Sequence, residues 1–400
     1  MSAQLVSLGD VAEFIRGVTY KPGDLTENFL TGSVVCMRTA NVQKALDQSD
    51  LLSIPRDLVR KESKILREGD LLVSTANSWN LVGKCCWVPA LSYPATAGGF
   101  IAILRGDDRK VDRRYLYHWF SSPDTQLNAR NCGRQTTNIA NMDVNRCLAL
   151  EMPLPPLPEQ RRIAAILDKA DALRAKRREA IAKLDQLLQS VFLDMFGDPV
   201  SNPKGWPMVK SGELYAEKPR IGTTRPATGK GCLVVRVGEV GDYKIALDKS
   251  SRVELPKADF DRYVLRSGDT VLARAIGSKD QLGKCSYFDG HQESVCIDSH
   301  VMRIRPEPSI CEPAWFHFLI SSPSGKSMLQ AKGGATAVQF NINASQASDM
   351  DVALPPLVIQ RRFLKISEQV RQQGDRSIQA AAQQADLFSS LQQRAFKGAL

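Results

Sequence analysis

The sequence contains no apolar run near the roughly 18 residues that a membrane-spanning helix needs. Its start, Met1 to Asp10, lacks the basic residues and the apolar stretch of a secretory signal. The nine cysteines include no C-x-x-C pair, which argues against a thioredoxin-like site and against a zinc ribbon. We therefore expect a cytoplasmic protein with scattered, reduced thiols.

The common catalytic signatures are also missing. There is no G-x-G-x-x-G, no G-x-x-x-x-G-K-[ST], no H-E-x-x-H and no G-x-S-x-G. The sequence therefore indicates no dinucleotide cradle, ATP site, zinc protease site or hydrolase nucleophile. It also lacks the Asn- or Asp-Pro-Pro-aromatic element of amino-methyltransferases. We expect no catalytic residues and no metal ligands in this chain.

What the sequence does contain is enough apolar material for several cores. The length of 400 residues predicts two to three domains. Since 43% of the residues are hydrophobic, each domain can form its own core, which excludes a disordered chain. The 53 basic residues exceed the 43 acidic ones, for a net charge of +10. The excess is spread along the chain, so it permits a polyanionic partner without pointing to one phosphate-gripping element.

The chain is a tandem duplication with a period of 200 residues. The Leu-Pro-Pro-Leu element at 154–157 and the Gln-Arg-Arg element at 160–162 recur at 354–357 and 360–362. Two candidate sites do not recur. His291, Cys296 and His300 have no counterpart in the first half, and the acidic-x-Lys triplets at 62–64 and 242–244 do not align. We therefore favour neither a zinc site nor a nuclease centre.

Each half ends in a segment that is typical of a long helix. From Pro158 to Phe196 there is no internal Gly or Pro, which predicts a helix about 58 Å long within the segment 158–198. Gly197-Asp198-Pro199 ends the pattern. Apolar residues recur at alternating steps of four and three from Ile163, which favours a seam for a partner helix. Residues 358–400 repeat the pattern more weakly, with Gly374 as a possible point of bending.

The two long helices are expected to pack against each other, antiparallel if the halves are related by a pseudo-two-fold axis. The alternative is that each helix packs only on its own globular half. Those halves, residues 1–157 and 199–357, mix short strands and helices, so the fold class is α+β. Strands are predicted over 69–74, 98–104, 232–237 and 269–273, and short buried helices over 115–120 and 315–320.

Polar turns recur at matched places in the two halves, but with different side chains. The first turn offers Ser74, Thr75, Asn77, Ser78, Trp79, Asn80 and Lys84 in one half, and Arg274, Ser278, Lys279, Gln281 and Lys284 in the other. The second turn offers Arg134, Gln135, Thr136, Thr137 and Asn138, against Thr336, Gln339 and Asn341. Amide and guanidinium groups pair with base edges in the major groove, so these residues are candidate DNA contacts. Ordinary solvated loop side chains are the alternative for each.

The order of these elements resembles the specificity subunit of type I restriction-modification enzymes. The resemblance covers the whole chain and is carried by residues 155–164, Pro-Pro-Leu-Pro-Glu-Gln-Arg-Arg-Ile-Ala. It is supported by a Gly-Asp and a Gly-Lys pair that recur in both halves, at 69–70 and 83–84 and at 268–269 and 283–284. The second copy departs from the pattern, with Val358-Ile359 in place of Pro-Glu. The resemblance implies two tandem target recognition domains, 1–157 and 199–357, joined by spacer helices over 158–198 and 358–400.

The resemblance also implies a DNA reader without catalysis of its own. Members of the family bind an asymmetric, split double-stranded DNA target, one part with each domain. They recruit two modification subunits, which use S-adenosylmethionine, and restriction subunits, which need ATP and Mg²⁺, so the cofactors belong to the partners. The docking residues expected on the helices are Gln160, Arg161, Arg162, Gln360, Arg361 and Arg362.

Two other functions remain open from the sequence. One is a stand-alone DNA-modifying enzyme, a nuclease or adenine methyltransferase, whose active site has no recognised signature. The other is a coiled-coil scaffold with protein-binding domains, which would explain the helices but not the different polar turns in matched frames. Discrimination between base sequences separates the reader from the scaffold, and methyl transfer by the chain alone would identify the enzyme.

Overall fold

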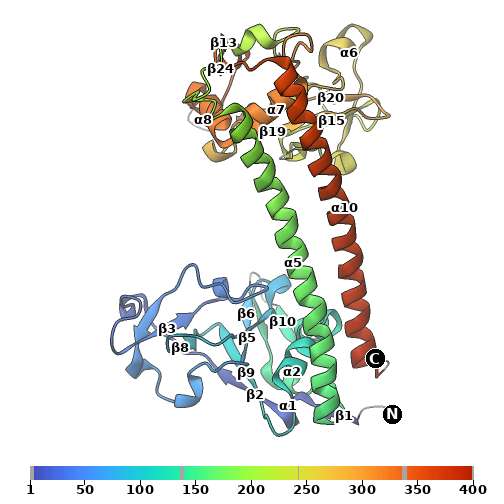
Figure 1. Ribbon diagram of the computed structural model, residues 1–400. Coiled ribbons are helices and arrows are strands. Elements are labelled where there is room, and N and C mark those ends of the chain that lie inside the picture. The colour runs from blue at the N-terminus through green and yellow to red at the C-terminus, as the bar shows by residue number, and fades with distance from the viewer. Residues whose placement is uncertain (1–3, 136–138, 242, 336–339, 399–400) are drawn as a thin grey trace. The chain divides into compact units, whose positions relative to one another are not determined.

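A computed structural model describes residues 4–135, 139–241, 243–335 and 340–398 (Figure 1). The chain forms two compact units. Unit 1 consists of Met1–Glu179 together with Ile378–Leu400, and unit 2 of Ala180–Ser377. Two long helices, α5 (Leu157–Phe196) and α10 (Leu357–Phe396), contribute residues to both units. Each unit is therefore a globular part completed by portions of both helices.

Unit 1 is a mixed α and β structure with four small sheets. Their orders are β1-β12, β2-β9-β5-β7, β4-β3-β8 and β10-β11-β6. The strands are β1 (Gln4–Ser7), β2 (Ala12–Arg16), β3 (Ser33–Met37), β4 (Ser53–Pro55), β5 (Leu71–Ser74), β6 (Ala76–Asn77), β7 (Cys85–Trp87), β8 (Ala95–Ala97), β9 (Ile101–Gly106), β10 (Gly133–Gln135), β11 (Ala140–Met142) and β12 (Glu151–Leu154). The shorter helices are α1 (Leu8–Val11), α2 (Arg113–Phe120), α3 (Pro123–Asn131) and α4 (Val144–Leu148).

Strand β5 is apolar along its length because both faces of its sheet are covered. Leu71 and Val73 belong to one core, which also contains residues of α2 and of both long helices. Leu72 belongs to a second core, shared with β3 and β8. A strand buried on both faces has no reason to alternate polar and apolar residues, and the run Leu-Leu-Val-Ser shows this directly.

Unit 2 repeats the architecture with the same sheet orders, β13-β24, β14-β21-β17-β19, β16-β15-β20 and β18-β23-β22. Its strands are β13 (Met208–Lys210), β14 (Arg220–Ile221), β15 (Cys232–Val235), β16 (Arg252–Val253), β17 (Thr270–Ala273), β18 (Ala275–Ile276), β19 (Cys285–Tyr287), β20 (Val295–Ile297), β21 (Val301–Ile304), β22 (Gly334–Ala335), β23 (Phe340–Asn341) and β24 (Asp351–Ala353). Its shorter helices are α6 (Lys257–Tyr263), α7 (Pro313–Ser321), α8 (Pro323–Lys332) and α9 (Ala344–Ser348). The duplication seen in the sequence is thus a duplication of topology.

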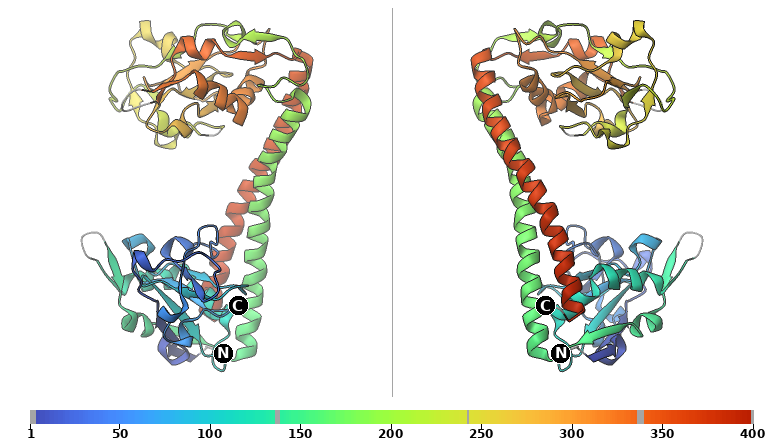
Figure 2. Two further views of the ribbon diagram at one scale, coloured as in Figure 1. Left: turned by 90° about the vertical axis from the view of Figure 1, so that its left-hand side faces the viewer. Right: turned by 90° about the vertical axis from the view of Figure 1, so that its right-hand side faces the viewer.

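The two long helices run in opposite directions where they meet within a unit, side by side in both views of Figure 2. In unit 2, the ring of Phe363 near the start of α10 packs on Phe192 near the end of α5, at 5.5 Å between centroids. Further along α10, Gly374 lies by Leu184, earlier in α5. In unit 1, Arg174 of α5 stacks on Phe388 of α10 at 4.3 Å. The packing combines both expectations, because each helix also packs on its own globular half.

Some expectations about the helices change. Helix α10 is one continuous helix through Gly374, so the chain does not loosen at the place where we expected a bent or loose segment. A Cβ at this glycine would meet only the Leu184 side chain, at 4.0 Å, so the position is a helix-to-helix contact rather than a break. Although α5 and α10 each have 40 residues, no described helix carries an apolar stretch able to span a bilayer.

Candidate nucleic-acid interface

The two polar turns predicted in the first half meet on one small sheet. Strand β6 comes from the first turn, while β10 and β11 come from the second, and their order is β10-β11-β6. The pairing places Asn141 of the central strand directly opposite Arg134 on one side and Ala76 on the other. Figure 1 labels β6 and β10 close together. Two turns that are far apart in the sequence therefore form one surface of unit 1.

Unit 2 contains the same sheet, in the order β18-β23-β22, with Asn341 on its central strand. The backbone anchors of the two sheets also match. The N–H of Met142 donates to the carbonyl of Thr75 (2.8 Å), and the N–H of Ile342 donates to the carbonyl of Arg274 (2.9 Å). The frames of the two surfaces are thus alike, whereas the side chains they carry differ.

Several predicted contact residues point into the domain and support this surface from below. Ser74 is 1% exposed and accepts a hydrogen bond from the amide of Asn77 (3.2 Å). The hydroxyl of Thr75 donates to the carbonyl of Phe100 (3.1 Å). The ring of Trp79 packs on the core of unit 1. These side chains hold the sheet in place, and Ser74 in particular has no surface with which to touch a base.

Two predicted basic contacts also have internal partners. The guanidinium of Arg274 donates to the carbonyls of Ile342 (3.1 Å) and Ser299 (3.0 Å), and burial lowers its pKa. It therefore ties β23 to the turn before β21. The Lys84 ammonium donates to the side-chain oxygen of Gln43 at 2.6 Å. Of the two, only Lys84 has a partner it can exchange easily, because that bond lies at an exposed site.

The remaining predicted residues divide by exposure. Ser78, Asn80, Arg134, Ser278 and Gln281 are exposed, and Lys284 and Asn341 are half-buried. Thr136, Thr137, Asn138, Thr336 and Gln339 lie outside the described residues, as do the side chains of Gln135 and Lys279. Asn141 was not among the predicted contact residues, although the matching Asn341 was. The 200-residue period was the signal that could have found it.

Gln160 and Gln360, predicted to meet partners, are instead buried anchors of the long helices. Gln160 is 1% exposed; its oxygen accepts from the N–H of Asp112 (2.7 Å), and its amide donates to the carbonyls of Lys110 and Pro155. Gln360 is fully buried and accepts from the N–H of Glu312 (2.8 Å). A side chain this enclosed offers a partner nothing, so each glutamine serves to fix its helix to α2 or α7.

The arginines beside these glutamines do face outward. The side chain of Arg161 is 67% exposed, 4.0 Å from Asp112, and that of Arg162 is 50% exposed in an ion pair with Glu159. Arg361 is 59% exposed and its guanidinium donates to Glu312 at 2.6 Å. Exposed ion pairs of this kind cost little to rearrange. These residues, and the exposed Arg362, stay candidates for docking.

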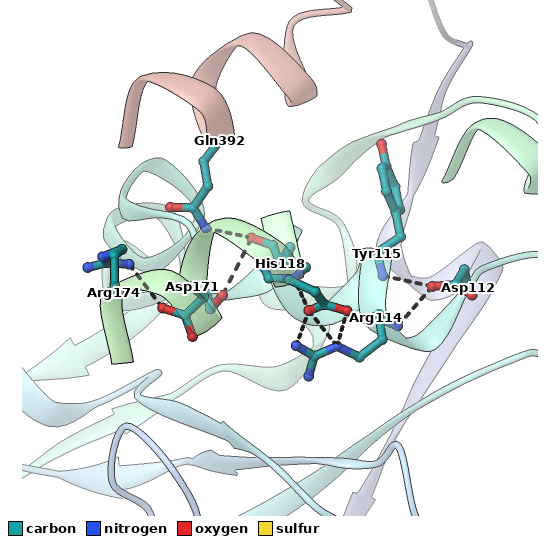
Figure 3. Close-up of polar contacts among 9 residues, drawn as sticks. Asp112, Arg114, Tyr115, His118, Asp171, Arg174 and Gln392 are labelled. Atoms are coloured by element: carbon teal, nitrogen blue, oxygen red, sulfur yellow. Dashed lines mark hydrogen bonds and ion pairs between the residues drawn. The ribbon is translucent and has the colours of Figure 1, made fainter. Parts of the chain in front are cut away.

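A partly buried ionic cluster in unit 1 joins α2 to α5 (Figure 3). The carboxylate of Asp168 accepts from the guanidinium of Arg114 (2.9 Å from Nε) and lies 2.7 Å from Nε2 of His118. Burial would raise the pKa of Asp168, but the hydrogen bonds from His118 and Arg114 outweigh it and lower the pKa to about 2. Gln392 of α10 donates to the carbonyl of His118 (3.2 Å), so the cluster also meets the second long helix.

In unit 2, an arginine stacked on aromatic rings makes the corresponding contact between a long helix and the globular part. Arg371, on α10, stacks over the ring of Tyr243 at 3.4 Å and over Phe318 at 4.6 Å. Burial, together with the charge of Arg371, lowers the pKa of His317 to about 3, so this histidine is neutral at physiological pH. Neither cluster holds a nucleophile beside a general base. We interpret both as structural contacts that attach the long helices to the rest of their unit.

A pocket of about 350 Å³ in unit 1 lies beside the ionic cluster, lined in part by Trp87, Arg113, Arg114 and Arg161. Its arginines are compensated: Arg113 pairs with Asp108, and Arg114 with Asp168. The pocket therefore presents no spare positive charge for an anion. Among the described residues, no three His, Cys, Asp or Glu side chains gather as metal ligands.

Comparison with known proteins connects this arrangement to one family. Residues 3–183 match the family model described as the type I restriction modification DNA specificity domain. The StySPI specificity subunit of Salmonella potsdam is 23% identical over 98% of this chain and 87% of its own length. The EcoKI specificity subunit of Escherichia coli K12 is 23% identical over 99% of this chain and 89% of its own length.

The fold is found among solved structures as well. A chain from a structure described as the basis of complex assembly and conformational transition of the type I R-M system has a TM-score of 0.61 and 19% identity, covering 100% of this chain and 98% of that one. A type I restriction-modification S subunit from M. genitalium has a TM-score of 0.54 and 13% identity, covering 98% and 96%. At these identities the likeness establishes the fold.

Proposed function

The chain belongs to the specificity subunits of type I restriction-modification enzymes, and we propose that it reads DNA for such an enzyme. Unit 1 and unit 2 would each bind one part of a split, asymmetric duplex target. The observation that carries this proposal is the pair of matched sheets, β10-β11-β6 and β18-β23-β22, which hold different polar side chains on one backbone frame. A two-part target read by two related domains needs such a combination.

The proposal extends to partners and cofactors. As a specificity subunit the chain assembles with DNA and with other subunits; we propose that these are two modification subunits and the restriction subunits. S-adenosylmethionine, ATP and Mg²⁺ would bind to those partners and not to this chain, and the complex would act in the cytoplasm, where the host DNA lies. Helices α5 and α10 would set the spacing between the two parts of the target.

The exposed faces of the long helices support a docking role. Beside Arg161, Arg162, Arg361 and Arg362, α5 and α10 expose large apolar side chains, among them Leu173, Leu187 and Val358, the last 72% exposed. Exposed apolar residues along a helix, rimmed by charge, are typical of protein interfaces. The modification subunits are therefore expected to bind along these helices.

The test is to express the chain with the modification subunits from its own host and to map methylated adenines by single-molecule sequencing of the DNA. The expected result is methylation at one split sequence, with two defined parts and a spacer of fixed length. Methylation by this chain without partners would instead identify a stand-alone methyltransferase. If the complex binds DNA equally well after base changes in both parts of the target, the chain would instead be a coiled-coil scaffold and not a DNA reader.

A further inference from the structure

The matched central strands of the two small sheets carry one residue in common, and its setting suggests a specific task. Asn141 lies in the middle of β11 and Asn341 at the end of β23, 200 residues later. Each lies between two paired strands, so each side chain stands at the centre of its sheet. A side chain on the central strand of such a sheet is well placed to enter a groove of DNA bound against the sheet.

The packing of the neighbouring residues fixes the direction of both asparagines. Ala140 and Met142 are 1% and 7% exposed and belong to the core of unit 1. In unit 2, Ile342 is fully buried and Phe340 packs against the core. Because side chains alternate along a strand, the residue between these must point away from the core. A shift of one residue would bury the asparagine, so the register holds it outward.

Both side-chain amides are available. Within the part of the chain that the structure describes, neither the amide of Asn141 nor that of Asn341 makes a hydrogen bond to another residue. Asn141 is exposed and Asn341 half-buried. The nearby side chains of Asn77 and Arg274 are in contrast engaged with internal partners. The two amides therefore have no structural role that would explain their presence.

The neighbours of the two asparagines follow a pattern of shared and different residues. On one side the directly opposite residue is alanine in both units, Ala76 and Ala275, whose methyl group is small. On the other side it is Arg134 in unit 1 and Gly334 in unit 2. A shared residue fits a contact common to both parts of the target, and the differing neighbour fits a base that differs between them.

An asparagine amide offers one donor and one acceptor side by side. In the major groove adenine presents an acceptor, N7, beside a donor, N6, whereas guanine presents two acceptors. The amide therefore matches adenine. We propose, on the basis of the function proposed above, that Asn141 and Asn341 are specificity-determining residues that each read one adenine, in the part of the target bound by its own unit.

The experiment uses the complex of the full chain with its modification subunits, bound to a duplex that carries the mapped target. Each adenine of the target is replaced in turn by 7-deazaadenine, which lacks the N7 acceptor. The wild-type complex is expected to bind about 10- to 100-fold more weakly for one adenine in each part. N141A should bind the natural target more weakly by a similar factor and lose all sensitivity to the analogue in the first part only. N341A should do the same in the second part only.

A matched control is N128A, which removes an exposed asparagine of α3 in the same unit, on a helix and not on a strand of the small sheet. It should bind as the wild type does. The proposal is overturned if N141A binds the target like N128A, if it weakens target and unrelated DNA equally, or if it keeps its sensitivity to every analogue. A wild-type complex that does not distinguish the target from unrelated DNA would instead overturn the proposed function itself. Because removal of the Asn141 side chain leaves no other group without a hydrogen-bond partner, N141A should have the same melting temperature as the wild type.

Discussion

At the scale of single residues, the availability of a side chain decides its role. Ser74 and Arg274 have side chains that suit base contacts, yet both are used inside the domain. Asp168 lies in a helix that the sequence predicts to form a coiled coil, yet its carboxylate is the hydrogen-bond acceptor of the ionic cluster in unit 1. Its partners, His118 and Arg114, are 50 and 54 residues away along the chain, so local patterns could not reveal the pairing.

Replacing Asp168 by asparagine should make the stability of unit 1 depend less on pH. The folded-state pKa of Asp168, about 2, is below its ordinary value of 3.8. Its ionised form is therefore favoured by folding, and this contribution is present above about pH 4 and lost as the pH falls toward 2. Because the carboxylate is 36% exposed, we discount the shift for solvent screening and expect D168N to lose about 1 kcal/mol at pH 7.

Urea unfolding of the full chain between pH 2 and pH 7, followed by tryptophan fluorescence, measures this loss. The control is D386N, which removes an exposed carboxylate of α10 in the same unit. D386N should stay within about 0.5 kcal/mol of the wild type. A D168N deficit that persists unchanged at pH 2 would contradict the assignment, because this pH is near the folded-state pKa, where about half of the wild-type carboxylate is protonated and most of its stabilising contribution is lost.

At the scale of elements, each long helix is attached to its domain by one buried glutamine. Gln160 and Gln360 each accept a hydrogen bond from the N–H of the residue that precedes α2 or α7, and each donates to the carbonyl of a proline before its own helix. The proline, residue 155 or 355, belongs to the Leu-Pro-Pro-Leu element. The repeated motif therefore encodes a helix joint, whereas we had predicted that Gln160 and Gln360 dock partner subunits.

Removal of this joint should destabilise one unit at a time. Q160A leaves an N–H and two carbonyls without partners at a buried site, and should cost about 2–4 kcal/mol in the free energy of unfolding of unit 1. Q360A should do the same for unit 2. R161A, one residue further on and exposed, should change stability by no more than about 0.5 kcal/mol. Hydrogen exchange of the backbone amides, read unit by unit, reports both effects. Equal losses for Q160A and R161A would mean that the buried bonds are not the joint.

The small sheets show why some elements escape sequence reading. Strands β6 and β18 have two residues each, too few for any alternation to be visible. They form because β11 and β23 pair with them across the domain. The sequence predicted two separate polar turns in each half as candidate DNA contacts, and it did not show that the two turns of a half lie on one sheet. Their union depends on tertiary contacts alone.

At the scale of the whole molecule, the duplication predicts that the two parts of the target can be changed independently. Replacing residues 4–154 with those of another specificity subunit should change one part of the methylated sequence and leave the other part intact. The α2 residues that face α10 should be retained, because Tyr115 packs on Phe396 and the carbonyl of His118 accepts from Gln392. Mapping of methylated adenines in cells that express the hybrid is the measurement. A change in both parts would contradict independent reading.

The duplication, the two long helices, the mixed α and β class and the resemblance to one family could be recognised from the sequence alone, because they depend on periodicity and on local motifs. The division of the chain became visible only in the folded structure: each unit takes residues from both long helices, since their apolar stripes complete the cores of both halves. The folded structure also decided which polar side chains remain free for a partner. That depends on whether backbone carbonyls and amides far along the chain form hydrogen bonds with those side chains. The side chain of Gln160 forms such bonds, whereas that of Asn141 does not.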